Sequence, residues 1–177
     1  MKSQVKFSFL LLISLISLFS CDPTRRMTEM ELAEQNVSTY ILVRHAEKDY
    51  GDNPILTPEG EARAEKLKFM LERVDLDAIY STNTKRTMST AMPTAEFHDL
   101  KIMEYQALEL NLLTSKLRGK HRGETVLVVG HSNTTPAVAS LLDKNEDYPR
   151  FSELDYTNYY VVTIPPKGKA RVLKMRF

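Results

Sequence analysis

The stretch Thr125-Val126-Leu127-Val128-Val129-Gly130-His131-Ser132-Asn133 decides the fold. Its continuous apolar run is typical of a strand buried on both faces of a parallel sheet. Polar residues follow the run at once, and a helical pattern through residues 137–142 comes next. This region therefore predicts a buried strand and a helix, with polar side chains at their junction.

The same strand-then-helix unit recurs on the N-terminal side of this stretch. Strands are expected at residues 40–43, 78–80 and 102–105, and the helices after them at about 57–74, 84–93 and 110–120. Thr57-Pro58 is a favourable helix start, and Pro93 is expected to disrupt the second helix. Residues 159–164 and 170–175, joined by Pro165-Pro166-Lys167-Gly168, predict a hairpin at the sheet edge. The pattern indicates an α/β fold, a three-layer α/β/α sandwich whose mostly parallel sheet has an antiparallel edge.

Three of the expected strands end in a comparable way. The first continues into Arg44-His45-Ala46-Glu47, the second into Ser81-Thr82-Asn83-Thr84-Lys85-Arg86-Thr87, and the fourth into Gly130-His131-Ser132-Asn133. In a parallel sheet these endings face the same rim, where ligands bind. Guanidinium groups suit phosphate oxygens, and an imidazole can attack phosphorus to give a covalent phosphohistidine. The sequence therefore predicts a phosphate site at this rim, to which the helix beginning near Asn133 adds backbone N–H groups.

Some of these residues also have a plainer explanation. Arg44-His45 alone would be read as a surface dipeptide, and Arg86 could pair with Glu96 or Asp99. Glu47 either orients its neighbours or is a solvated loop carboxylate. We expect His98 and His121 in surface connections, and the tyrosines at 156, 159 and 160 packed on an edge strand.

The motifs at the strand ends resemble those of the histidine phosphatase superfamily, the phosphoglycerate-mutase-like proteins. Leu42-Val43-Arg44-His45-Ala46-Glu47 resembles the family signature, with Ala46 in place of the usual glycine. Leu56-Thr57-Pro58-Glu59-Gly60 is similar to the start of the family's first helix. Residues 81–87 resemble its second arginine motif, and residues 129–132 its second histidine motif. The four motifs occur in the family's order.

The resemblance implies a role for each matching residue. His45 would be the phosphorylated nucleophile, and Arg44, Arg86 and His131 would bind the phosphate oxygens, with Ser132 and Asn133 beside them on the substrate side. The family needs no metal or other cofactor. Many members use an acid after the third strand to protonate the leaving group. Glu109 lies nearer the rim than Glu104 and is our candidate for that acid.

The implied function is a metal-independent phosphatase acting on a phosphomonoester or phosphohistidine, either in a small molecule or in a phosphoprotein. A mutase is less favoured, because the connection after Arg86 is too short for a large lid. The alternative from another class is a catalytically weak or inactive lipoprotein that binds phosphorylated or anionic ligands. A nucleotide-binding redox domain lacks the expected G-x-G-x-x-G after the first strand.

The N-terminal residues predict export and lipidation. Lys2 and Lys6 precede an apolar run over residues 7–19, too short to span a bilayer and typical of a secretory signal. Leu18-Phe19-Ser20-Cys21 resembles the lipobox of bacterial lipoproteins, which implies a lipid on Cys21 after cleavage. We expect a signal peptide at 1–20, an anchor and tether at 21–37, and a folded domain at 38–177. The chain would then be held on a bacterial membrane, facing the periplasm or the cell surface.

Composition sets the remaining limits. The chain has 42% hydrophobic and 27% charged residues, which suits one globular domain. Its formal net charge of +1, without a basic run interleaved with aromatics, gives no indication of a nucleic-acid partner. Cys21 is the single cysteine, so the domain is built without disulfides.

Overall fold

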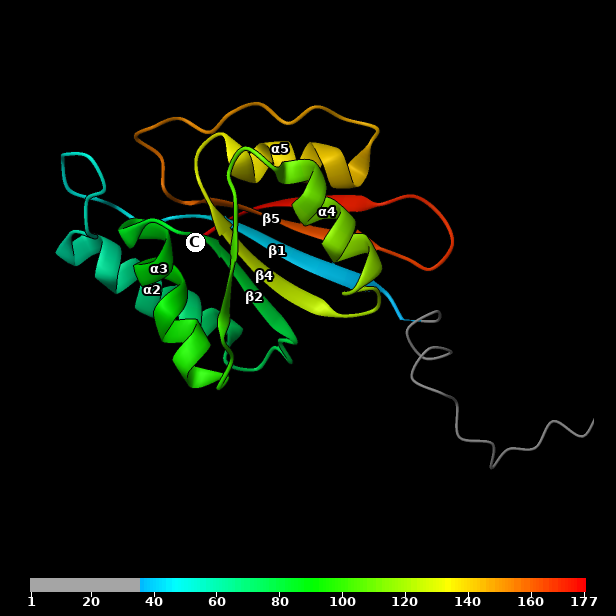
Figure 1. Ribbon diagram of the computed structural model, residues 1–177, viewed down its shortest axis with the longest axis horizontal. Coiled ribbons are helices and arrows are strands. Elements are labelled where there is room, and N and C mark those ends of the chain that lie inside the picture. The colour runs from blue at the N-terminus through cyan, green and yellow to red at the C-terminus, as the bar shows by residue number, and fades with distance from the viewer. Residues whose placement is uncertain (1–35) are drawn as a thin grey trace, which may run out of the picture.

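The structure, a computed structural model, describes residues 36–177. Within this range a six-stranded sheet has the strand order β3-β2-β4-β1-β5-β6 (Figure 1). The strands are β1 (Ser38–Arg44), β2 (Ala78–Thr82), β3 (Ile102–Tyr105), β4 (Thr125–Gly130), β5 (Asn158–Ile164) and β6 (Arg171–Arg176). β1 to β4 pair in parallel, whereas β5 and β6 are antiparallel to their neighbours. The predicted parallel sheet and its antiparallel edge are confirmed.

Helices cover both faces of the sheet. They are α2 (Pro58–Leu71), α3 (Lys85–Phe97), α4 (Leu110–Gly119) and α5 (Thr134–Asp143). In Figure 1, α2 and α3 lie together on one side, and α4 and α5 on the other. The three-layer arrangement follows from this and was predicted correctly.

The two cores come from alternate residues of the same central strands. Tyr40 and Leu42 of β1 pack with α4 and α5, whereas Ile41 and Val43 pack with α2 and α3. Successive side chains of a strand point to opposite faces, so a strand buried on both faces must be apolar throughout. The apolar runs that identified β1 and β4 therefore reflect their central place in the sheet.

The helix through Pro93 corrects one prediction. We expected Pro93 to disrupt the helix, but α3 continues past it to Phe97. Proline removes one backbone hydrogen bond of the helix. Ala91 and Ala95, on either side of it, are buried in the core beneath α3. Packing on both sides of the proline holds the helix together.

His121 corrects a second prediction. It lies in the turn before β4, but its side chain is only 3% exposed instead of lying on the surface. Its Nε2 atom is 2.8 Å from the Tyr80 hydroxyl, and its Nδ1 atom is 2.6 Å from a carboxylate oxygen of Glu124. A turn residue becomes buried here because tertiary packing places it beneath the sheet's N-terminal edge.

The expected signal peptide, Cys21 and nearly all of the tether lie outside the described residues. Among residues 36–177, no helix is both long enough and apolar enough to span a bilayer.

Candidate active site

The carboxyl ends of β1 and β4 bring two histidines together. Arg44 pairs with Gly130 across these strands, and the His45 backbone N–H donates to the Gly130 carbonyl at 2.9 Å. The rings of His45 and His131 then lie edge to face with centroids 5.5 Å apart. The strand-end argument correctly predicted this meeting.

His45 is buried and held as a neutral imidazole. Its Nδ1 atom is 2.8 Å from the Ala46 carbonyl, which can only accept a hydrogen bond, so Nδ1 carries the proton and Nε2 keeps its lone pair. Burial, together with the nearby charges of Arg44 and Arg86, lowers the pKa of His45 to about 3. The ring therefore presents an unprotonated nitrogen at every ordinary pH.

His131 is placed by the end of β2 and the start of α3. Its Nε2 atom is 2.9 Å from the Thr82 hydroxyl, and its Nδ1 atom is 3.4 Å from Nη2 of Arg86. Burial and the two arginines lower the pKa of His131 to about 4. Because Arg86 donates a hydrogen bond to Nδ1, that nitrogen carries no proton. The ring proton of the neutral imidazole therefore lies on Nε2, facing the Thr82 hydroxyl.

Both arginines keep an unused donor inside the protein. Arg44 is 1% exposed, and Arg86 is partly buried in the first turn of α3. In each guanidinium the Nε atom is buried without a hydrogen-bond partner among the described residues. Unpaired buried donors beside neutral imidazoles are what an oxyanion would satisfy.

Thr90 fixes the backbone that carries the nucleophile candidate. Its hydroxyl accepts a hydrogen bond from the Ala46 N–H at 2.9 Å and donates to the Arg86 carbonyl at 2.7 Å. Ala46 is fully buried against Leu56. α3 therefore holds the loop after His45 in place through one buried hydroxyl.

Residues 150–157, between α5 and β5, contribute contacts that the sequence did not predict. Nη1 of Arg44 donates to the carbonyls of Ser152 and Asp155 at 2.7 and 3.0 Å. Tyr156 lies over the Arg44 guanidinium, 4.1 Å from its ring centroid, and its ring is 5.9 Å from that of His45. We expected Tyr156 to pack an edge strand, and that prediction was wrong because the residue precedes β5 and turns toward the rim.

Glu153 is the acidic residue that contacts this cluster. One carboxylate oxygen lies 2.8 Å from Nη2 of Arg44, and the other accepts from the Ser132 hydroxyl at 2.6 Å. The Ser132 hydrogen bond, with Arg150 and Arg44, lowers the pKa of Glu153. No local pattern marks Glu153 in the sequence, because irregular backbone carries it to the rim.

The remaining predicted residues lie apart from the histidine pair. Glu109 is exposed at the start of α4 and lines a hollow of about 90 Å³ with Glu104. Neither acid forms a hydrogen bond or ion pair with the histidines or arginines of the rim within residues 36–177. Asn133 is exposed before α5 and makes no side-chain cap to it. The roles assigned to these three residues stay predictions.

Glu47 is paired instead of solvated. Its two carboxylate oxygens lie 2.7 to 2.9 Å from Nε and Nη2 of Arg63, whose Nη1 donates to the Phe177 carbonyl at 2.6 Å.

Within residues 36–177, no group of three or more His, Cys, Asp or Glu side chains lies close enough to hold a metal ion.

Comparison with known proteins agrees with this geometry. Residues 40–109 match the family described as the histidine phosphatase superfamily, branch 1. This range is less than half of the 177-residue chain, so the match is a likeness to the superfamily over that part. The matched range includes Arg44, His45, Arg86 and Glu109 and ends before His131.

Individual relatives show how far the likeness extends. Phosphoserine phosphatase 1 of Hydrogenobacter thermophilus is 38% identical over 72 residues, which cover 36% of this chain and only 34% of that protein. The protein histidine phosphatase SixA, solved with tungstate, superposes with a TM-score of 0.66 at 18% identity over 78% of this chain and 96% of its own. Phosphoglycerate mutase of Bacillus anthracis gives a TM-score of 0.61 at 14% identity, covering 81% and 94%. At these identities the two structures establish that the fold is shared.

Proposed function

We propose that this chain is a metal-independent phosphatase that works through a phosphohistidine on His45. The observation that carries the proposal is a buried, neutral His45 whose Nε2 lone pair is kept available by the Nδ1 bond to Ala46. A weak base held unprotonated next to cationic groups is suited to attack on phosphorus. The similarity to phosphatases supports this reading.

Phosphate binding is assigned to the groups with unused donors. The Nε–H groups of Arg44 and Arg86 would donate to phosphate oxygens, with Ser132 beside them. Their positive charge stabilises the charge that spreads over the equatorial oxygens during transfer. The substrate's negative charge would in turn offset the cost of burying two guanidinium groups.

The reaction then takes two steps. The lone pair of His45 Nε2 forms a bond to phosphorus as the bond to the leaving atom breaks, which is oxygen in an ester and nitrogen in a phosphohistidine. The leaving group takes a proton from the general acid, unless it departs as a stable anion such as p-nitrophenolate. Water attacks the phosphohistidine next, the P–N bond breaks, and inorganic phosphate departs. Both steps use the same fixed charges, so the protein needs no large rearrangement between them.

The substrate is assigned by class. A hollow of about 710 Å³ adjoins Arg86 in sequence and is lined by Asn83, Lys85, Met88, Met92 and Ile55, among others. It has room for far more than a phosphate group, and its mixed polar and apolar lining suits an organic leaving group. We propose a phosphomonoester or phosphohistidine substrate, carried by a small molecule or a phosphoprotein.

Turnover of p-nitrophenyl phosphate by the full chain in detergent, with EDTA present across pH 5 to 8, tests the proposal. We expect phosphate release that chelator does not stop and that His45→Ala abolishes. Enzyme quenched in alkali should also carry a phosphate on His45 that acid treatment releases. If that ester, a panel of other phosphoesters and a phosphohistidine peptide are all left intact, a non-catalytic anion-binding protein becomes the better description.

The proton donor is tested with two leaving groups. An alkyl ester needs protonation as it leaves, whereas p-nitrophenolate leaves without it. If Glu109 is the acid, Glu109→Gln slows hydrolysis of glycerol phosphate and spares p-nitrophenyl phosphate. The same selective loss in Glu153→Gln would instead assign the proton to the carboxylate that contacts the cluster.

We also propose that the chain is exported and carries lipid on Cys21, from its lipobox-like sequence. Metabolic labelling with a radioactive fatty acid should mark the wild-type chain and leave Cys21→Ala unlabelled. Equal labelling of the two proteins would contradict lipidation at Cys21.

A further inference from the structure

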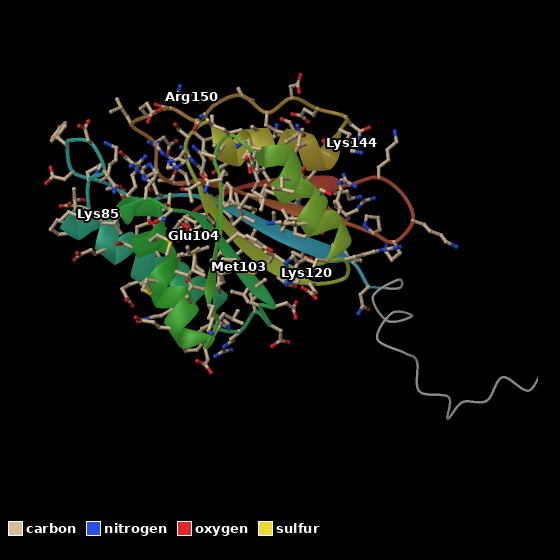
Figure 2. All side chains as sticks on the ribbon, viewed as in Figure 1. Lys85, Met103, Glu104, Lys120, Lys144 and Arg150 are labelled. Carbon is tan, nitrogen blue, oxygen red and sulfur yellow. The ribbon has the colours of Figure 1, made fainter. Side chains whose placement is uncertain are left out.

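The end of the sheet opposite the histidines gathers basic residues around the point where the chain enters β1. Residues 36–38 lead into the strand there, between the turn after α4 and the turn of the β5–β6 hairpin. Figure 2 labels Lys120 beside this entry, far from Lys85 at the opposite rim. We name as the basic end six cations in these turns or in the elements beside them: Arg118, Lys120, Arg122, Lys167, Lys169 and Arg171.

Five cations of the basic end are exposed and available to a partner. The sixth, Arg118, is half-buried and donates through Nη2 to the Leu142 carbonyl. None forms an ion pair with a carboxylate of residues 36–177. The carboxylate next to them, Glu124, is already held by His121 at 2.6 Å. Positive charge at this end is therefore left unneutralised within the described domain.

A hollow at the same end is lined in part by basic side chains. It measures about 270 Å³ and is lined by Arg118 and Arg122, by Asn36 and Ser38, and by residues 164–168 of the hairpin turn. The Arg118 Nε atom is buried without a hydrogen-bond partner among the described residues. A phosphate oxygen would satisfy this donor while the guanidinium of Arg122 binds a second oxygen.

We propose that the basic end docks onto a bilayer surface and binds the phosphate headgroups of anionic phospholipids. Basic residues near an anionic bilayer each raise the surface affinity about fivefold. Whatever precedes residue 36 is attached at this end. A lipid on Cys21 would be tethered by fifteen residues, which reach about 50 Å at most. The domain would therefore be held within reach of the headgroups with its basic end toward them.

Docking in this way fixes the orientation of the catalytic rim. β1 runs from the basic end to Arg44 over seven residues, so the rim lies roughly 20 Å farther from the bilayer. His45 and the hollow beside Arg86 would then face the aqueous side. This inference concerns a different surface from the proposed phosphatase site and does not depend on its activity.

Lysine labelling of the full chain in vesicles tests the proposal. The chain is reconstituted in phosphatidylcholine vesicles with or without about a third phosphatidylglycerol, and an amine-reactive reagent is quantified at each lysine. We expect Lys120, Lys167 and Lys169 to react at least threefold more slowly on the anionic vesicles, with Lys85 unchanged. The protection should vanish in 0.5 M salt, because exposed charges are then screened. Equal labelling on both vesicles would overturn the proposal.

Charge reversal provides the matched control. In Lys167→Glu/Lys169→Glu/Arg171→Glu, Lys120 should lose its protection on anionic vesicles while hydrolysis of a soluble ester stays unchanged. Lys66→Glu/Arg73→Glu/Lys101→Glu changes the net charge equally on exposed residues along the α2–β3 side and should keep the protection. Loss of protection in both variants would show a response to net charge alone and contradict a localised headgroup site.

Discussion

Arg86 and Lys85 are neighbours at the start of α3, but only Arg86 reaches the histidine pair. Arg86→Ala removes a donor aimed at the developing phosphoryl charge, and we expect kcat/KM for p-nitrophenyl phosphate to fall about 100-fold to 1,000-fold. Lys85→Ala, which removes an exposed cation one residue away, should change it less than about twofold. Comparable losses in both variants would mean that general positive charge, instead of the Arg86 fork, drives binding.

Glu153 contacts two residues that we propose bind phosphate, so we expect it to compete with phosphate for them. Its carboxylate bridges Arg44 and Ser132, both of which are assigned to phosphate. Glu153→Gln keeps the shape but removes the charge, so inorganic phosphate should inhibit about twofold to fivefold more strongly. Glu146→Gln alters a carboxylate that pairs with Lys174 elsewhere and should leave the inhibition constant unchanged. Unchanged inhibition in Glu153→Gln would show that phosphate binds without displacing the carboxylate.

Sequence reasoning found the site residues that directly follow strands. Arg44, His45 and His131 were predictable because parallel strands deliver their last residues to one rim. Glu153 and Tyr156 were not, because irregular backbone brings them to the rim and no periodicity reports where such a segment folds back. The strand-end rule therefore finds the two histidines and Arg44 and misses Glu153 and Tyr156, which contact the Arg44 guanidinium.

At the scale of elements, two threonines on one face of α3 give a matched comparison. Thr90 satisfies the buried Ala46 N–H, whereas the hydroxyl of Thr94, one turn later, is buried without a partner among the described residues. Thr90→Val leaves a buried donor unpaired and should cost about 1–3 kcal/mol in the free energy of unfolding. Thr94→Val removes an unsatisfied hydroxyl and should be neutral or stabilising. Urea unfolding of both variants measures this, and equal destabilisation would contradict it.

The elements themselves were largely readable from the sequence. Apolar runs predicted the central strands, and Thr57-Pro58 predicted the start of α2. Thr57 caps this helix, and its hydroxyl accepts a hydrogen bond from the Gly60 N–H at 3.2 Å. The end of α3 was misjudged because local proline propensity was weighed without the packing of Ala91 and Ala95. His121 was misjudged for the same reason, since burial of a turn depends on what folds over it.

At the scale of the whole molecule, burying His45 couples stability to pH. The unfolded chain protonates this histidine near its ordinary pKa of 6.5, whereas the folded protein resists until about 3. The unfolded state binds more protons between these values, so the free energy of unfolding falls as the pH drops below about 6.5. His45 should account for about 2 kcal/mol of loss between pH 7.5 and 5.

Urea unfolding at several pH values measures this contribution. His45→Asn removes the titrating group, so its stability should fall less steeply with decreasing pH than that of the wild type. The free energy of unfolding of the variant should still fall somewhat with decreasing pH, because His131 is buried with its pKa lowered to about 4. Parallel curves for the two proteins would show that His45 is not the group responsible.

The far end of the chain has a practical consequence. The Arg63 guanidinium donates hydrogen bonds both to the Glu47 carboxylate and to the Phe177 carbonyl. Arg63 therefore links the last described residue to the loop that follows His45. An affinity tag fused after Phe177 would therefore begin close to the loop that follows His45. A tag placed before residue 36 would instead let the protein be immobilised on a bead or a sensor chip with the rim that carries His45 turned toward the solution.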